Sequence, residues 1–353
     1  MSDPLRTGRE APHHGTETDD RREQRLYEIR RQAESEGQVK AMGVRPSGAP
    51  FPVASPQTGY YGLPLLKKPA WTWEIPLYFF VGGAAGSAAV LAAPARWIAR
   101  DEKLARDCRY VAAAGTVIST ALLVSDLGRP ARFLSMLRVF KKQSPMSVGA
   151  WTLAAFGTYA AGSALAAMLD QRFDSAPIRI AGNVSAGISA LAGLPFSNYT
   201  GVLIGASVIP VWNQNAAMLP VHFGMSGLNS AVSILELIGH QNRALNTLGM
   251  GASAIETIEG LNIELSKKPA MEPLKRGVSG AITRIGGLLS GPLPLALRVA
   301  AIFASRRRSR QLRKTAAVSS IAGSLLTRVA WVYAGHVSSR NLQLPLELNA
   351  SKE

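Results

Sequence analysis

An acidic residue and two arginines stand at the end of an otherwise apolar run. Residues 111–124 are mostly apolar, and Asp126, Arg129 and Arg132 follow directly. Asp126 and Arg129 are spaced three residues apart, at which opposite charges on a helix can pair, and Pro130 stops a helix. Such a rigid corner can hold a polar ligand group or a docked protein, because a guanidinium presents several donors in one plane. The alternative is that these residues only anchor a helix at the water boundary.

Apolar segments of membrane-spanning length position this corner. About 20 helical residues cross a hydrocarbon layer of ~30 Å. The sequence predicts an all-α integral membrane protein with about eight transmembrane helices in two four-helix bundles. The expected spans are residues 75–98, 110–125, 148–169, 178–212, 219–239, 245–261, 278–303 and 316–336. Residues 178–212 exceed one straight span, so Pro195 predicts either a kinked helix or a short re-entrant piece before a helix from Tyr199.

Composition divides the chain into three parts. Residues 1–69 are polar and rich in proline and glycine, residues 70–340 hold the apolar segments, and residues 341–353 form a short polar tail. The N-terminal part is too polar to bury a core. We expect this extension either to be disordered or to wrap a partner subunit through its charged, helix-prone segment 20–36.

The chain carries a formal net charge of +16. A basic balance of this size indicates either nucleic acid or a membrane face, and clustering between the apolar segments favours the membrane and no nucleic acid. Residues 96–109 and 306–314 form the main clusters. Under the eight-span count they share one side, which the positive-inside rule makes cytoplasmic, so both termini are predicted on the periplasmic side of a bacterial inner membrane. Lysines and arginines on the opposite face keep the inverse orientation open.

The cysteines and histidines limit which redox cofactors the chain can hold. Cys108 is the one cysteine, which excludes an internal disulfide and an iron–sulfur cluster held by four thiolates. His222, His240 and His336 are the histidines outside the polar extension. A membrane di-haem protein needs two histidines for each haem, so we expect no haem, no metal site and no redox cofactor belonging to this chain.

Five motifs follow one another along the chain. They are WEIPLYFFVGGAAG at residues 73–86, DLGRP with Arg132 and Phe133 at residues 126–133, SPMSVGAW at residues 144–151, Tyr199–Gly201 with Pro210–Trp212, and RVAWVYAG at residues 328–335. In this order they resemble the NrfD/PsrC family, the membrane subunits of polysulfide-reductase-type complexes. The resemblance covers residues 61–338.

The resemblance implies a quinone-reactive membrane anchor of eight helices, usually without haem. Its expected partners are a ferredoxin-like, multi-cluster iron–sulfur subunit and a molybdopterin oxidoreductase subunit, besides membrane lipid. Menaquinone or ubiquinone would be the bound substrate, near the face where the iron–sulfur subunit docks. Whether the chain acts as an enzyme by itself, and which donor or acceptor the complex uses, stay open.

Quinone carbonyls need hydrogen-bond donors or acids in an apolar, aromatic pocket. The candidates for quinone binding and proton exchange are Glu74, Tyr78, Asp126, Arg129, Tyr199 and His222, and those for partner docking are Arg129, Arg132, Lys141 and Lys142. Each has a structural alternative: a helix start stabilises an acid such as Glu74, tyrosines belong to interfacial belts, and His222 could be a packed core residue. Trp73, Trp151 and Trp212 are predicted as belt aromatics.

Ionisable residues inside spans are costly and indicate function. They are Glu236, Glu256, Glu259, Arg284, Arg298 and Arg328. The three acids are candidates for a proton path; alternatively, the acids and arginines form buried ion pairs that fix helix order, which we favour for Arg328. A purely structural anchor and a secondary transporter are the rival functions. Transport would require matching broken helices in two halves, whereas the sequence indicates one interrupted region, around Pro195.

Overall fold

The computed structural model describes residues 16–35, 66–127 and 133–340. All regular elements in these ranges are helices, and no strand occurs in them. Residues 69–338 form one compact unit, and helix α1 (Thr16–Ser35) belongs to a second unit. In the larger unit the helices are α2 (Glu74–Trp97), α3 (Glu102–Asp126), α4 (Phe133–Met136), α5 (Pro145–Phe173), α6 (Ala176–Gly205), α7 (Pro210–Asn213), α8 (Met218–Ile238), α9 (Arg243–Leu265), the 3₁₀ turn η4 (Pro269–Met271), α10 (Glu272–Lys275), α11 (Gly277–Ser290), α12 (Pro292–Phe303) and α13 (Arg306–Ser339).

Seven helical segments in the described ranges are long and apolar enough to cross a membrane, when α11 and α12 are taken as one. They confirm the predicted all-α membrane protein. The predicted span at residues 245–261 is helix α9, which has 23 residues but is not among the seven. Its buried acids Glu256 and Glu259 lower its hydropathy, and it packs against α8 and α12. Polar groups inside a bundle are satisfied by neighbouring helices instead of lipid.

Two interruptions differ from the sequence prediction. Helix α6 runs unbroken through Pro195, so the re-entrant alternative is wrong. Side chains next to the proline donate hydrogen bonds to the backbone: the Ser197 hydroxyl and the Asn198 amide both donate to the Leu194 carbonyl, at 2.8 and 2.7 Å. The proline itself removes the backbone donor to a different carbonyl, that of Leu191, and membrane helices tolerate such a loss. The seventh span, by contrast, breaks between α11 and α12 at Gly291, which the apolar run at residues 278–303 concealed.

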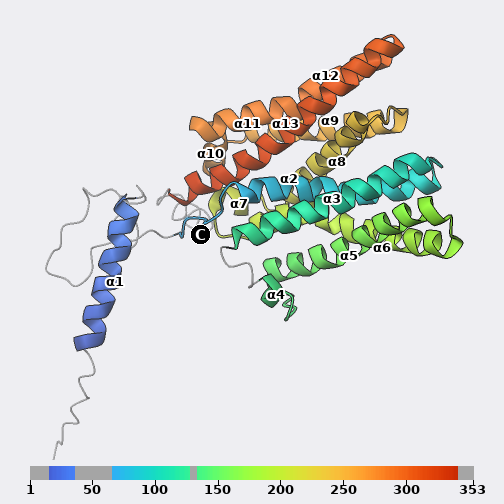
Figure 1. The fold of residues 1–353 in the computed structure, drawn as a ribbon. Coiled ribbons are helices and arrows are strands. Elements are labelled where there is room, and N and C mark those ends of the chain that lie inside the picture. The colour runs from blue at the N-terminus through green and yellow to red at the C-terminus, as the bar shows by residue number, and fades with distance from the viewer. Residues whose placement is uncertain (1–15, 36–65, 128–132, 341–353) are drawn as a thin grey trace, which may run out of the picture. The chain divides into compact units, whose positions relative to one another are not determined.

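The membrane helices fall into two groups (Figure 1). Helices α2, α3, α5 and α6 pack together, and α8 carries α9 on one side while contacting α2 and α6 on the other. Helix α13 joins the second group, since the Ser324 and Ser226 hydroxyls lie 2.9 Å apart and Ser319 donates to the Leu289 carbonyl of α11. Helix α2 therefore lies at the centre, and most of its span is buried.

Glycine lets α2 and α6 approach closely. A Cβ atom on Gly86 would lie 2.6 Å from the Gly193 carbonyl oxygen and 2.9 Å from the Ser197 nitrogen, both backbone atoms. Small residues permit such contacts between membrane helices.

We expect Gly86→Ala to destabilise the fold by about 1–3 kcal/mol, because rigid backbone must move apart. Unfolding of the purified chain by SDS titration in mixed micelles measures this. Gly251→Ala is the matched control, since nothing lies within 4 Å of its Cβ position. Alanine there is expected to stabilise helix α9 by about 0.5–1 kcal/mol. Equal effects of the two substitutions would contradict the close contact.

Candidate functional site

A cavity of about 70 Å³ lies among α2, α3, α5 and α6, at the end of the unit where α3 terminates. Its lining consists of Trp71, Ile75, Tyr78, Phe79, Leu123, Asp126, Leu127, Met136, Met146, Gly149, Ala150, Tyr199 and Leu203. Most of these side chains are apolar, and the polar groups are two phenols and one carboxylate. A small number of polar groups in an apolar pocket is the usual pattern of a site for a small organic ligand.

The helix geometry explains how these groups meet. Ile75, Tyr78 and Phe79 share one face of α2 because residues three and four apart in a helix are neighbours. Asp126 is the last residue of α3, so its carboxylate stands where the helix meets the loop. Tyr199 reaches the cavity from α6, and any side chain at Gly149 on α5 would overlap its phenol ring. The absent side chain of Gly149 therefore creates the space that Tyr199 occupies.

The two phenols differ in their hydrogen bonding. The Tyr199 hydroxyl donates to the Pro145 carbonyl oxygen, which fixes the ring. Tyr78 is buried, with an exposed fraction of 3%, and its hydroxyl has no hydrogen-bond partner among the described residues. A buried polar group usually finds a partner, so this hydroxyl is available to a ligand in the cavity.

Acidic groups lie at the mouth of the cavity. Asp126 is half-buried, and Glu74 is close enough to repel it electrostatically. Glu74 accepts a hydrogen bond from the Thr72 hydroxyl and is not itself part of the lining. A half-buried carboxylate contacts both the cavity and water, which allows proton exchange between them.

A second polar site is buried in the neighbouring helices. His222 on α8 has its Nδ1 atom 2.7 Å from the carboxylate of Glu259 on α9, and its Nε2 atom is buried without a partner. Glu256, also on α9, is buried, and the Ser226 and Ser290 hydroxyls are among its nearest polar neighbours. Arg328 acts on Glu256 electrostatically. Unpaired buried groups are costly, so this cluster is a candidate for function.

A comparison with protein-family models assigns this chain to a family. The family model described as "Polysulphide reductase, NrfD" matches residues 66–262, which is more than half of the chain. The chain belongs to the NrfD family of polysulphide reductase membrane subunits. A search of curated proteins gave no match. The match confirms the family resemblance and covers the whole cavity, from α2 into α9, whereas the last motif, residues 328–335, lies beyond it.

The structure of this NrfD-family chain brings three of the sequence-predicted residues into one cavity: Tyr78, Asp126 and Tyr199. Glu74 lies beside them. His222 does not line the cavity: the rings of Phe79 and Phe223, with centroids 5.9 Å apart, separate the two places. Arg129 and Arg132 lie outside the described residues.

Sequence reasoning missed the apolar lining. Trp71, Phe79, Met136, Met146 and Leu203 line the cavity and were not among the candidates. Only their position in the sequence could have indicated them, since each lies in or within a few residues of a motif or of the α3–α5 connection. Apolar residues are common everywhere in a membrane protein, so their type alone carries no signal.

Trp212 was wrongly predicted as a belt aromatic. Its exposed fraction is 1%, its ring stacks on Trp71 with centroids 5.2 Å apart, and its Nε1 atom donates to the Trp331 carbonyl oxygen at 2.8 Å. Trp73 and Trp151 are exposed. Trp212 therefore supports the wall of the cavity from behind, because Trp71 is a lining residue.

The buried charges form two different arrangements. Glu236 lies 2.7 Å from Arg298 and 2.5 Å from Arg313, so it belongs to a buried ion triad. It follows His222 on α8 by 14 residues, which places it roughly 21 Å farther along the helix at 1.5 Å per residue. Arg328 has no carboxylate within 4 Å in the described chain and donates to the Phe223 carbonyl at 2.9 Å and to the Ser226 hydroxyl. The ion-pair interpretation is thus wrong for Arg328.

No group of three or more histidine, cysteine, aspartate or glutamate side chains is arranged to hold a metal ion in the part of the chain that the structure describes. Lys141 and Lys142 are exposed on the connection before α5. Their connection runs from Met136 at the end of α4 to the start of α5, where Met146 lies, and both methionines line the cavity.

Proposed function

We propose that this NrfD-family chain is the quinone-reactive membrane subunit of a redox complex. It would exchange electrons between a partner iron–sulfur subunit and menaquinone or ubiquinone. The observation that carries the proposal is the apolar cavity with the unpartnered Tyr78 hydroxyl and the Asp126 carboxylate. A quinone head group is flat, largely apolar and carries two carbonyl oxygens, so it matches this combination of groups.

Each polar group has a separate task in this proposal. The Tyr78 hydroxyl would donate a hydrogen bond to one quinone carbonyl, while Tyr199 forms part of the wall. Reduction of the quinone needs two electrons from the partner and two protons, and oxidation of the quinol returns both. Asp126 would pass these protons between the cavity and water, with Glu74 as the neighbouring acid.

The surface around the cavity fits a docked partner. Lys141, Lys142, Phe140 and Trp73 are exposed there. Aromatic residues are enriched in protein interfaces, and surface cations steer the approach of an oppositely charged partner. We assign the iron–sulfur subunit, and a molybdopterin subunit beyond it, to this face. Arg129 and Arg132, which lie outside the described residues, stay candidates for docking from the sequence alone. The same assignment places this face on the periplasmic side of a bacterial inner membrane, because the 306–314 cluster lies at the opposite end of α13.

The His222–Glu259 pair and Glu256 would form a further proton-exchange group. They are buried, close to one another and only two aromatic rings from the cavity. Glu236 is assigned a structural role instead, since both of its neighbours are arginines.

Binding of a quinone analogue to the purified full chain tests the proposal. We expect Tyr78→Phe to weaken binding about fivefold, which is the loss of one neutral hydrogen bond. Tyr159→Phe is the matched control, because Tyr159 is an exposed tyrosine of α5 outside the cavity lining and its loss should leave the affinity unchanged. A purely structural anchor would bind no analogue at all, and equal affinities of the two variants would remove Tyr78 from the site.

A further inference from the structure

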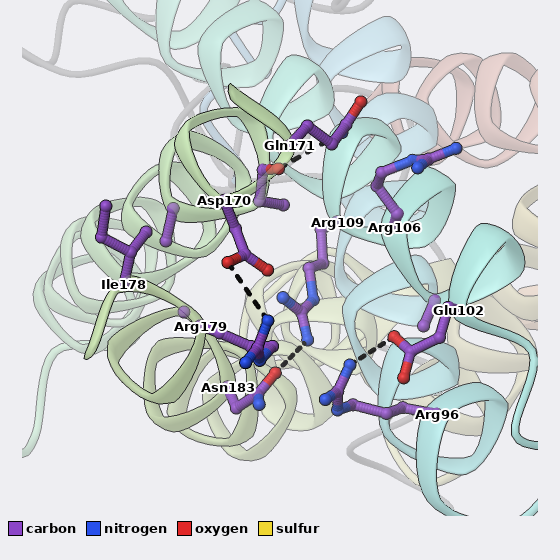
Figure 2. A pocket seen from close by; sticks show the side chains of 13 residues that line it. Arg96, Glu102, Arg106, Arg109, Asp170, Gln171, Ile178, Arg179 and Asn183 are labelled. Carbon is purple, nitrogen blue, oxygen red and sulfur yellow. Dashed lines mark hydrogen bonds and ion pairs between the residues drawn. The ribbon is translucent and has the colours of Figure 1, made fainter. Parts of the chain in front are cut away.

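A second pocket, of about 370 Å³, lies between the other ends of the same helices (Figure 2). Its lining contains four arginines and two acids, Arg96, Arg106, Arg109, Arg179, Glu102 and Asp170, besides Gln171 and Asn183. Figure 2 shows Arg96, Arg109 and Arg179 pointing toward one another from α2, α3 and α6, whereas Arg106 points away from them. From the pocket geometry we propose that it binds the phosphate group of an anionic phospholipid.

One of the four lining arginines has no paired carboxylate. Arg96 pairs with Glu102, and Arg106 lies 3.9 Å from Asp107. Arg179 lies 3.6 Å from Asp170 and 3.1 Å from Asp174. Arg109 has no carboxylate within 4 Å among the described residues. Arg109 is therefore the lining arginine without a paired carboxylate, and a phosphate group would supply a negative charge beside it.

Arg109 is the lining arginine that the fold buries and holds in place. Its exposed fraction is 8%, its Nη2 atom donates to the Asn183 amide oxygen at 2.8 Å, and its Nε atom is buried without a partner. The bond to Asn183 fixes the guanidinium between α3 and α6. A buried, fixed arginine with an unused donor indicates a ligand that accepts hydrogen bonds.

The surroundings favour a lipid over a free anion. Large apolar side chains near the lining arginines are exposed: Trp97 and Ile98 follow Arg96, Phe173 ends α5, and Ile180 follows Arg179 near the start of α6. Acyl chains would cover these side chains while the head group meets the arginines. Basic pockets between transmembrane helices are known to take anionic lipid head groups in this way.

The pocket is separate from the quinone cavity. Arg109 and Asp126 are both on α3 and lie 17 residues apart, roughly 25 Å along the helix at 1.5 Å per residue. The lipid would hold the α2–α3 end against the α5–α6 end, so it would act on stability and assembly and not on the chemistry at Asp126.

Native mass spectrometry of the detergent-purified full chain, titrated with phosphatidylglycerol or phosphatidylcholine, tests this proposal. We expect the wild type to bind phosphatidylglycerol preferentially, and Arg109→Gln with Arg179→Gln to weaken this binding about 25-fold, or about fivefold for each arginine. Arg243→Gln is the matched control, since Arg243 is exposed at the start of α9 and outside the pocket. Its lipid affinity should equal that of the wild type.

A second double variant decides the question if the Arg109→Gln variant does not fold. The side chains of Arg106 and Arg179 are 36% and 43% exposed, so Arg106→Gln with Arg179→Gln should fold normally and still weaken lipid binding. Unchanged affinity for phosphatidylglycerol in this folded variant would overturn the proposal. Inorganic phosphate is the second arm: if millimolar phosphate displaces the lipid completely, the pocket is a free-anion site and the lipid assignment is wrong.

Discussion

Replacing Asp126 by asparagine is expected to lower quinone turnover of the assembled complex by about a hundredfold, while the affinity for a quinone analogue changes little. Asparagine keeps the shape of the side chain at the end of α3 but cannot take up and release a proton. General acid–base groups commonly contribute about 10²–10⁴-fold to rate. Turnover of a soluble quinone in membranes and analogue binding to the purified chain together measure the two quantities.

Glu272→Gln is the control for this experiment. Glu272 is an exposed carboxylate of α10 that pairs with Arg276 one turn away, so its loss should leave turnover unchanged. If Asp126→Asn lowered analogue affinity and turnover to the same extent, Asp126 would hold the ligand instead of exchanging protons. Wild-type turnover in Asp126→Asn would exclude the carboxylate from the reaction.

Replacing Glu236 by glutamine is expected to destabilise the helix bundle by about 3–5 kcal/mol. The carboxylate is fully buried and lies between Arg298 and Arg313, from α12 and α13. Without its charge, two guanidinium groups would remain in the interior with no counter-charge in the triad. SDS titration of the purified chain measures the change, and loss of the folded chain during purification is the extreme form of the same result.

An exposed ion pair provides the comparison for this effect. Arg284 and Glu264 pair at 2.8 Å with side chains 60% and 49% exposed, so Glu264→Gln should cost at most about 1 kcal/mol. Equal stability of Glu236→Gln and Glu264→Gln would show that the triad does not hold the second group of helices together. A proton path through Glu236 would instead lower turnover without loss of stability.

Hydropathy was enough to predict the helical class and most of the spans, because lipid requires long apolar helices with satisfied backbones. Hydropathy did not predict where a helix breaks inside an apolar segment. The break at Gly291 lies inside the apolar run at residues 278–303, and its backbone approaches Thr257 of α9 closely. Pro195, the stronger signal for a break, is accommodated within α6.

The polar residues at the helix ends were predictable for a different reason. Tyr78, Asp126 and Tyr199 belong to the motifs that carry the sequence resemblance, lie within the residues that the family model matches, and line one cavity in the structure. Partners between helices were not predictable, because spacing along one helix does not reveal which neighbour it contacts. Glu236 meets Arg313 across 77 residues, and His222 meets Glu259 across 37. The stacking of Trp71 on Trp212 was hidden for the same reason.

Photolabelling with an azido-quinone, followed by peptide mapping of the full chain in membranes, tests the central claim most directly. The account predicts labels on cavity residues such as Tyr78, Met136, Met146 or Leu203, with labelling abolished by excess unmodified quinone. Labels confined to the lipid-facing surface of α5 and α6, or labels that excess quinone does not compete away, would contradict it.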